Sequence, residues 1–234
     1  MAALADALHL LEQKRDRHGA PRHSPIGIAA IRFIALSGVR RGECQQLRWD
    51  EVDDLGTCLA LGETKTGASL RPLSQAAFAV VDGLEPISDH VFAAGPEQPG
   101  YQGLPGLWET VQKTARLSTE AAAKGRGEKI PESGPLDSVT LHSLRHSFAG
   151  VAEQLGATIP TIAAMLGHRL SGVTGGYILK RVDSLLIDAA NRVGDHIAAL
   201  MRGEAPSAQV IQFRPRGRSA SPTVDAKAPT KARK

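Results

Sequence analysis

Apolar residues recur every three or four positions through most of this 234-residue chain, which is the spacing of amphipathic helices. The pattern predicts helices from the first residues to about Arg15, and over residues 25–37, 40–49, 74–84, 107–117, 141–155, 160–167 and 184–201. Two short runs, Thr57–Leu61 and Ser69–Leu73, favour strands joined by a turn at Lys65–Gly67, and residues 49–53 could add a third strand. The sequence therefore predicts a mainly α fold with a small antiparallel β-sheet, an α+β class.

Residue types at the predicted helix ends support this division. Ser24 can cap the helix that starts at Pro25, and Gly38 suits a left-handed turn that ends it. Thr140 precedes a later helix, and Gly167 follows a short one. These signals predict where the helices begin and end.

Three stretches lack regular patterning. Pro and Gly are frequent in residues 95–106, which predicts a loop, and residues 118–138 have no sustained apolar face, which predicts a flexible surface insertion. After residue 202 the chain is rich in Pro, Ser, Ala and Arg, a composition typical of disorder. We therefore expect one domain over residues 1–202 and a basic, disordered tail over residues 203–234.

Composition narrows the class of protein. Cys44 and Cys58 form no metal-type spacing and are too few for a disulfide framework, which favours a reducing, cytoplasmic location. No apolar run is long enough to cross a bilayer, and the first residues do not form a signal peptide. We therefore expect no membrane partner.

The formal net charge of +4 comes from the tail rather than from the body of the chain. From Gly203 onward seven basic residues outnumber two acidic ones, so the tail carries +5 and the remaining residues carry −1. Net charge alone does not identify the body as a nucleic-acid binder. Such a function must rest on the positions of individual cations.

Several residues suggest chemistry, although each is ordinary by itself. His142 and Arg145, three positions apart, share a helix stripe that differs from the apolar one. Arg40 follows a helix end, and Glu43 lies three residues further on, where it could support Arg40. Lys65 lies at the predicted hairpin turn. Taken singly, these features are typical of solvated helix faces and charged turns.

The stretch LGHRLSGVTGGY adds a histidine and a tyrosine, and Tyr177 is one of only two tyrosines in the chain. Glycines in this stretch loosen the backbone, which suits a side chain that must move onto a target.

Together these residues predict phosphoryl transfer. Two arginines can present planar forks to the oxygens of one phosphate, and a lysine can protonate a departing oxygen. Histidines can orient the phosphate or accept a proton, and a tyrosine supplies a nucleophilic oxygen. Guanidiniums then stand where other enzymes use metal ions, so we expect neither a metal nor a cofactor. The members of the set are Arg40, Lys65, His142, Arg145, His168 and Tyr177.

The chain resembles the catalytic domain of the tyrosine recombinase, or phage integrase, family from about residue 5 to residue 201. LSGVRRGECQQLRWDEVD is similar to the family's first block, and KTGASLRPL is similar to its lysine hairpin. LHSLRHSFA is similar to its HxxR block, and LGHRLSGVTGGY to its last block. The resemblance implies that the six residues of the set are catalytic and that Glu43 supports them.

The resemblance also implies a mechanism for site-specific DNA recombination. Tyr177 would attack a DNA phosphate to give a 3′-phosphotyrosyl link, which a 5′-hydroxyl of a partner strand would resolve without ATP or metal. Arg40 and Arg145 would hold the non-bridging oxygens, and Lys65 would protonate the leaving 5′-oxygen. His142 would act as an acid/base or bind the phosphate, and His168 would donate a further hydrogen bond.

The implied partner is double-stranded DNA, bound by a homotetramer that assembles through the C-terminal helix. The apolar face from Leu185 to Leu200 is the candidate for this docking, and packing on its own domain is the alternative. Members of the family usually carry a helical core-binding domain ahead of the catalytic one. We expect that domain to be absent here.

Three other functions fit parts of the sequence. A type IB topoisomerase shares the chemistry but lets the cut strand swivel, and the absence of a large clamp argues against it. A truncated, recombination-deficient DNA-binding remnant would keep the fold, although all six catalytic positions are filled. His142 and His146, four positions apart on a helix, could bind a metal, but no acidic third ligand stands out.

Overall fold

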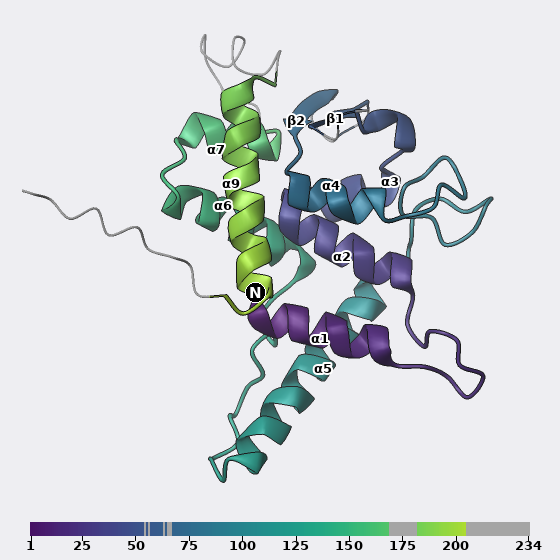
Figure 1. Ribbon diagram of the computed structural model, residues 1–234, viewed down its shortest axis with the longest axis vertical. Helices are drawn as coiled ribbons and strands as arrows, with labels where there is room; N and C mark the ends of the chain where they lie inside the picture. Colours follow the sequence, from purple (N-terminus) through teal and green to yellow (C-terminus); the bar gives the residue numbers. More distant parts are fainter. Residues whose placement is uncertain (54, 56, 63, 65–66, 169–181, 205–234) are drawn as a thin grey trace, which may run out of the picture.

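The computed structural model describes residues 1–53, 55, 57–62, 64, 67–168 and 182–204. Its helices are α1 (Ala2–Gln13), α2 (Pro25–Ser37), α3 (Arg41–Gln46), the 3-10 helix η1 (Trp49–Glu51), α4 (Gln75–Asp82), α5 (Leu104–Gly125), α6 (Leu141–Gln154), α7 (Ile159–Leu166) and α9 (Ser184–Met201). Strands β1 (Cys58–Leu61) and β2 (Ser69–Pro72) pair antiparallel, with Cys58 opposite Pro72 and Leu61 opposite Ser69. The predicted fold class, mainly α with a small antiparallel β-sheet, is confirmed (Figure 1).

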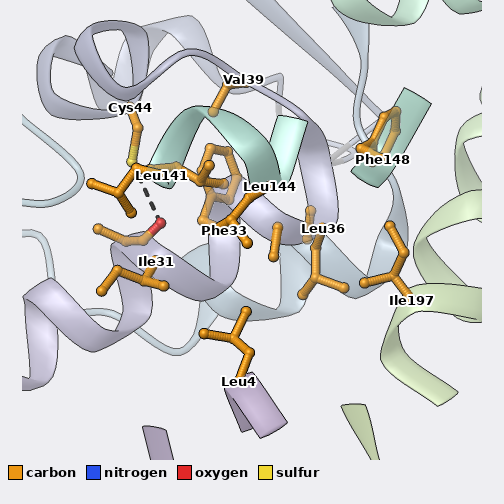
Figure 2. Packing of buried hydrophobic residues seen from close by; sticks show 14 of the residues in the cluster. Leu4, Ile31, Phe33, Leu36, Val39, Cys44, Leu141, Leu144, Phe148 and Ile197 are labelled. Atoms are coloured by element: carbon orange, nitrogen blue, oxygen red, sulfur yellow. Dashed lines mark hydrogen bonds between the residues drawn. The ribbon is translucent and has the colours of Figure 1, made fainter. Parts of the chain in front are cut away.

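Helix α2 is the centre of the fold. It contacts α1, α4, α5, α6 and α9, and its residues Ile28, Ile31 and Phe33 are at most 1% exposed. Each such side chain stabilises the fold by about 1.5–3 kcal/mol through removal of apolar surface from water. The residues packed around α2 include Leu4 of α1, Leu144 and Phe148 of α6, and Ile197 of α9 (Figure 2).

Both ends of α2 form as the sequence predicted. Ser24 Oγ accepts a hydrogen bond from the backbone N–H of Gly27 at 3.2 Å, and Gly38 ends the helix in the left-handed conformation with φ 66°. Helix α7 ends in the same way at Gly167, with φ 65°. The two helix ends are neighbours, because a Cβ added at Gly38 would lie 3.0 Å from Leu166 Cδ2.

Residues 49–53 do not form the third strand that the sequence suggested, although Val52 pairs with Leu59 of β1 in a single antiparallel bridge. They begin with the 3-10 helix η1, in which Glu51 Oε2 accepts a hydrogen bond from the backbone N–H of Arg48 at 3.1 Å. Glu51 Oε1 accepts another from the N–H of Gly62 at 2.7 Å, which ties this turn to the hairpin. Side-chain capping therefore overrides the strand-like alternation at this point.

Helix α5 is longer than predicted at both ends. The sequence indicated a helix over residues 107–117, whereas α5 begins at Leu104 and ends at Gly125. Residues 118–125 were expected to be part of a surface insertion, and that expectation is wrong. Their stretch is rich in alanine, the best helix former, and Ala123 is only 2% exposed.

The apolar face of α9 packs on its own domain. Its residues Ala190, Val193, Gly194 and Ile197 are buried, and the helix contacts α1, α2, α4, α6 and α7. Of the two alternatives for this face, docking on a neighbouring subunit and packing on the same domain, the structure shows the second for Val193 and Ile197, whereas Leu185 is 77% exposed (Figure 1).

The structure also describes the state of the two cysteines and the length and polarity of the helices. Cys44 and Cys58 are free thiols, and burial raises the pKa of the Cys44 thiol, whose Sγ lies 3.8 Å from the carbonyl oxygen of Ala30. In the described ranges, every helix is too short or too polar to cross a membrane.

A close approach between α9 and the start of α4 gives a stability prediction. A Cβ added at Gly194 would lie 2.3 Å from Ser74 Oγ, and Ser74 is only 2% exposed. Ser74 Oγ also accepts a hydrogen bond from Ala77 N–H and donates one to the carbonyl oxygen of Leu36, so it cannot move without losing both. We expect Gly194→Ala to lower the free energy of unfolding by about 1–3 kcal/mol.

Gly150→Ala is the matched control, because Gly150 lies within α6 and an added Cβ would meet nothing within 4 Å. Alanine is the better helix former, so this variant should raise the free energy of unfolding by about 0.5–1 kcal/mol. Urea titration followed by circular dichroism measures both changes. A Gly194→Ala chain at least as stable as the unmodified one would show that the contact at Ser74 is not tight.

Candidate functional site

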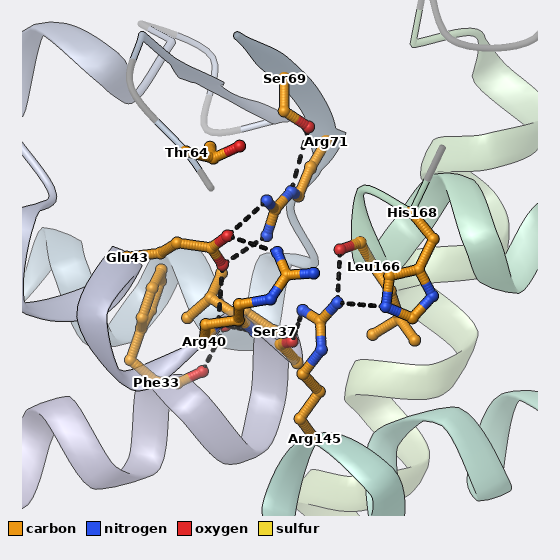
Figure 3. A network of polar contacts seen from close by, with 12 residues as sticks. Phe33, Ser37, Arg40, Glu43, Thr64, Ser69, Arg71, Arg145, Leu166 and His168 are labelled. Carbon is orange, nitrogen blue, oxygen red and sulfur yellow. Dashed lines mark hydrogen bonds and ion pairs between the residues drawn. The ribbon is translucent and has the colours of Figure 1, made fainter. Parts of the chain in front are cut away.

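Three arginines from separate segments of the chain converge near the ends of α2 and α7 (Figure 3). Arg40 is the N-cap residue of α3, Arg71 belongs to β2, and Arg145 belongs to α6. Glu43 of α3 lies between Arg40 and Arg71, and His168 lies beside Arg145. The structure therefore brings together four of the residues singled out in the sequence, and it adds Arg71.

Glu43 holds Arg40 at the start of α3. Its Oε1 accepts a hydrogen bond from Arg40 Nη1 at 2.7 Å, and its Oε2 accepts one from the Arg40 backbone N–H at 2.7 Å. The Glu43 side chain is 7% exposed, whereas the Arg40 side chain is 26% exposed. Glu43 thus lies against Arg40 as the sequence suggested, and part of the Arg40 side chain remains accessible.

Arg71 is the second partner of Glu43, and the sequence reasoning did not identify it. Arg71 Nη1 and Nη2 donate to the two carboxylate oxygens of Glu43, each at 2.7 Å, and Arg71 Nε donates to Ser69 Oγ at 3.2 Å. The side chain is 1% exposed. Strand alternation is the signal that could have revealed it, since Arg71 lies two positions before the buried Leu73 and therefore faces the same way.

Arg145 is held by the ends of two helices. Its Nη1 donates to the carbonyl oxygen of Gly38 at 2.6 Å, and its Nη2 donates to that of Leu166 at 2.7 Å. Carbonyl groups at a helix C-terminus carry partial negative charge, so they stabilise a buried guanidinium. Arg145 is 3% exposed, and the left-handed turn at Gly38 places one of its two acceptors.

His168 completes this group. Its Nε2 lies 2.9 Å from Arg145 Nη2. Burial lowers the pKa of His168, and the charges of Arg145, Arg40 and Arg71 lower it further, so the ring is neutral near pH 7. Because a guanidinium can only donate, Nε2 is the acceptor and the proton resides on Nδ1.

Two of the four charged groups in the site, Arg145 and Glu43, have shifted pKa values. Burial, and then the like charges of Arg40 and Arg71, lower the pKa of Arg145 to about 10, which leaves it protonated at neutral pH. Burial would raise the pKa of Glu43, but the hydrogen bonds and charge of Arg71, together with the hydrogen bonds of Arg40, lower it to about 2. The site therefore contains three guanidiniums and one carboxylate, a net charge of +2.

His142 lies at the edge of this group. It is exposed, and its ring meets that of His146 edge-on, with the ring centroids 4.7 Å apart. His142 and Arg40 line the same cavity, of about 610 Å³, between the start of α3, α5 and the segment before α6. Among the described residues, no group of three histidine, cysteine, aspartate or glutamate side chains is placed to hold a metal ion.

Two predicted site residues, Lys65 and Tyr177, lie outside the described residues. Their proposed roles stay predictions from the sequence. Lys65 lies six positions before Arg71, and Tyr177 lies nine positions after His168, so both are close along the chain to residues of the group.

The depressed pKa of Glu43 gives a prediction for stability against pH. Between pH 4.5 and about pH 2 the unfolded carboxylate binds a proton that the folded one does not, so the stabilisation is present above pH 4.5 and is lost as the pH falls. From pH 5 to pH 2 the unfolding free energy of the native chain should fall by on the order of 3 kcal/mol more than that of Glu43→Gln. Urea titrations across this range measure it, and parallel curves would contradict the assignment.

Comparison with known proteins identifies the family. The sequence model of the phage integrase family matches residues 26–182. "Prophage integrase IntF" of Escherichia coli (strain K12) is 25% identical over 188 residues, which are 79% of this chain and 38% of that protein. "Putative integrase/recombinase y4gC" of Sinorhizobium fredii (strain NBRC 101917 / NGR234) is 25% identical over 186 residues, which are 75% of this chain and 89% of that protein.

One solved structure with a related shape is that of the Tn1549 transposon integrase (aa 82-397) in complex with circular intermediate DNA. It matches with a TM-score of 0.48 and 15% identity, over 79% of this chain and 61% of that chain.

The chain spans well under half the length of the E. coli relative and most of the length of the S. fredii relative. Since the family match extends over more than half of the sequence, the chain belongs to the phage integrase family.

Proposed function

We propose that this chain catalyses site-specific recombination of double-stranded DNA through a covalent link between Tyr177 and a DNA 3′-phosphate. One observation carries the proposal: Arg40, Arg145 and His168 lie in one site of a chain that belongs to the phage integrase family. The names of the two relatives, an integrase and an integrase/recombinase, support the same activity. We include residues 1–202 in the catalytic unit.

The charges of the site suit a phosphate in the act of transfer. Arg71 and Glu43 neutralise each other, which leaves the charges of Arg40 and Arg145 uncompensated. A phosphodiester carries one negative charge, and attack by an oxygen nucleophile spreads further charge onto its non-bridging oxygens. Two guanidinium forks fixed in advance stabilise that charge without reorganisation.

In the proposed reaction the Tyr177 oxygen forms a bond to phosphorus as the bond between phosphorus and the 5′-oxygen breaks. Lys65 gives a proton to the leaving 5′-oxygen. The energy of the diester is kept in the phosphotyrosyl bond, so a 5′-hydroxyl of another strand can attack it and release Tyr177 without ATP. His142 accepts the proton of the Tyr177 hydroxyl as its oxygen attacks and returns it when Tyr177 is released, and His168 Nδ1–H donates a hydrogen bond to the phosphate.

Recombination would bring several copies of the chain together on DNA, and we propose a homotetramer. Most of the apolar face of α9 is occupied by its own domain, whereas Leu185 at the start of the helix is 77% exposed and remains accessible to another subunit. The basic residues from Arg214 onward lie outside the described part of the chain, and we propose that they strengthen DNA binding through counterion release.

Covalent capture of DNA tests the proposed function. The probe is a pool of labelled, nicked duplexes of randomised sequence, incubated with the chain and resolved on denaturing gels. The unmodified chain should capture a subset of the duplexes, and Tyr177→Phe should capture none because the nucleophilic oxygen is gone. Non-covalent binding of the captured sequence should change by less than about threefold. Capture by Tyr177→Phe would show that another residue is the nucleophile.

The same assay tests the arginines. Arg40→Gln and Arg145→Gln should each slow capture of the selected duplex by about 10²–10³-fold, the usual cost of losing one preorganised donor to a developing negative charge. Arg126→Gln is the control, because Arg126 forms an exposed pair with Glu128 and should leave the rate unchanged.

Two further readouts separate the alternative functions. Relaxation of a supercoiled plasmid that carries the selected sequence, without strand exchange, would indicate a swivelling topoisomerase instead. Binding of DNA with no capture of any duplex would indicate a non-catalytic remnant.

A further inference from the structure

We propose that Arg71 is a positioning residue for strand transfer: it occupies the carboxylate of Glu43 so that Arg40 keeps the free side of its guanidinium directed at the DNA phosphate. This inference rests on the proposed function. It starts from a guanidinium that is 1% exposed and whose three nitrogens all donate hydrogen bonds, two to Glu43 and one to Ser69. Since all three of its nitrogens already donate hydrogen bonds within the protein, we assign Arg71 a supporting role and leave the phosphate to Arg40 and Arg145.

Arg40 and Arg71 share the two oxygens of one carboxylate. Arg71 donates to both, so Arg40 is left with a single side-chain bond, from Nη1 to Oε1. Within the part of the chain that the structure describes, Arg40 Nε and Nη2 form no hydrogen bond. If Arg71 were absent, the Arg40 fork could close on both oxygens of Glu43, since bidentate pairing is the preferred geometry of arginine with a carboxylate.

Arg71 also contacts both parts of the site, the one that carries Arg40 and the one that carries His168. Its guanidinium lies against Gly167, where an added Cβ would be 2.2 Å from Arg71 Nε. Gly167 directly precedes His168, and the neighbouring Leu166 carbonyl accepts from Arg145. One buried side chain on β2 therefore contacts both the start of α3, which carries Arg40, and the end of α7, which leads to His168 (Figure 3).

This role requires arginine rather than another cation. Two parallel N–H groups match the two carboxylate oxygens, and the Nε–H reaches Ser69 at the same time. A lysine ammonium keeps the charge but offers one point of contact and no planar fork. Arg71→Lys therefore separates the charge of the residue from its geometry.

The test compares Arg71→Lys with Arg32→Lys in the full chain. Arg32 also pairs with a glutamate through both carboxylate oxygens, since Arg32 Nη2 lies 2.8 Å from Glu12 Oε2, but it joins α1 to α2 away from the site. With saturating amounts of the selected duplex, Arg71→Lys should slow covalent capture by about 10- to 100-fold, a usual cost of disturbing a supporting partner. Its DNA dissociation constant should stay close to that of Arg32→Lys at a temperature where both variants are folded.

A double variant distinguishes positioning from simple neutralisation of a buried charge. Replacing both members of a buried ion pair by apolar residues is often neutral for stability. Arg71→Met combined with Glu43→Met should therefore melt near the native temperature and still capture DNA slowly, because Arg40 has lost its support. Recovery of the native capture rate in this double variant would show that Arg71 only neutralises Glu43, and it would overturn the proposal.

A crystal structure of the Arg71→Lys chain gives a readout that needs no DNA. We expect the Arg40 fork to close on both oxygens of Glu43. An Arg40 side chain unmoved from its place here would overturn the inference whether or not the chain captures DNA. Failure of the unmodified chain to capture any duplex would instead count against the proposed function, so the two failures are distinguishable.

Discussion

The site depends on one buried carboxylate, that of Glu43, shared by two arginines. An unpaired carboxylate at 7% exposure would be strongly destabilising, and a group of three guanidiniums without it would repel. The carboxylate resolves both problems. It accepts hydrogen bonds from Arg71 and Arg40, and because its pKa is about 2 it is ionised at neutral pH. What remains is a surplus of two positive charges, held in fixed positions where we propose that a phosphate binds.

Backbone geometry supplies the rest of the support. Arg145 is bound by carbonyl groups at the ends of α2 and α7, and left-handed glycines form both ends. The helix that crosses the centre of the core thus also provides an acceptor for a proposed catalytic side chain. Substitutions that disturb core packing around α2 should therefore lower the reaction rate as well as the stability of the fold.

The sequence predicted the helices, their caps and most of the converging residues, because those depend on local spacing and on recognisable blocks. It missed Arg71, since the burial of a strand arginine depends on the acidic residue that tertiary folding brings to it from α3. It also allowed a third strand over residues 49–53, where the Glu51 side chain closes a 3-10 turn instead. Periodicity could not decide whether the apolar face of α9 packs on its own domain or on another subunit, because an apolar stripe does not specify its partner.

The central claim is that Arg40 and Arg145 hold one DNA phosphate while Arg71 remains on Glu43. A crystal structure of the chain bound to its selected duplex, with vanadate in place of the transferring phosphate, tests this most directly. We predict hydrogen bonds of about 3 Å from both guanidiniums to vanadate oxygens, with the Tyr177 oxygen bonded to vanadium. Vanadate bound away from either arginine, or Arg71 turned from Glu43 onto the vanadate, would contradict the account.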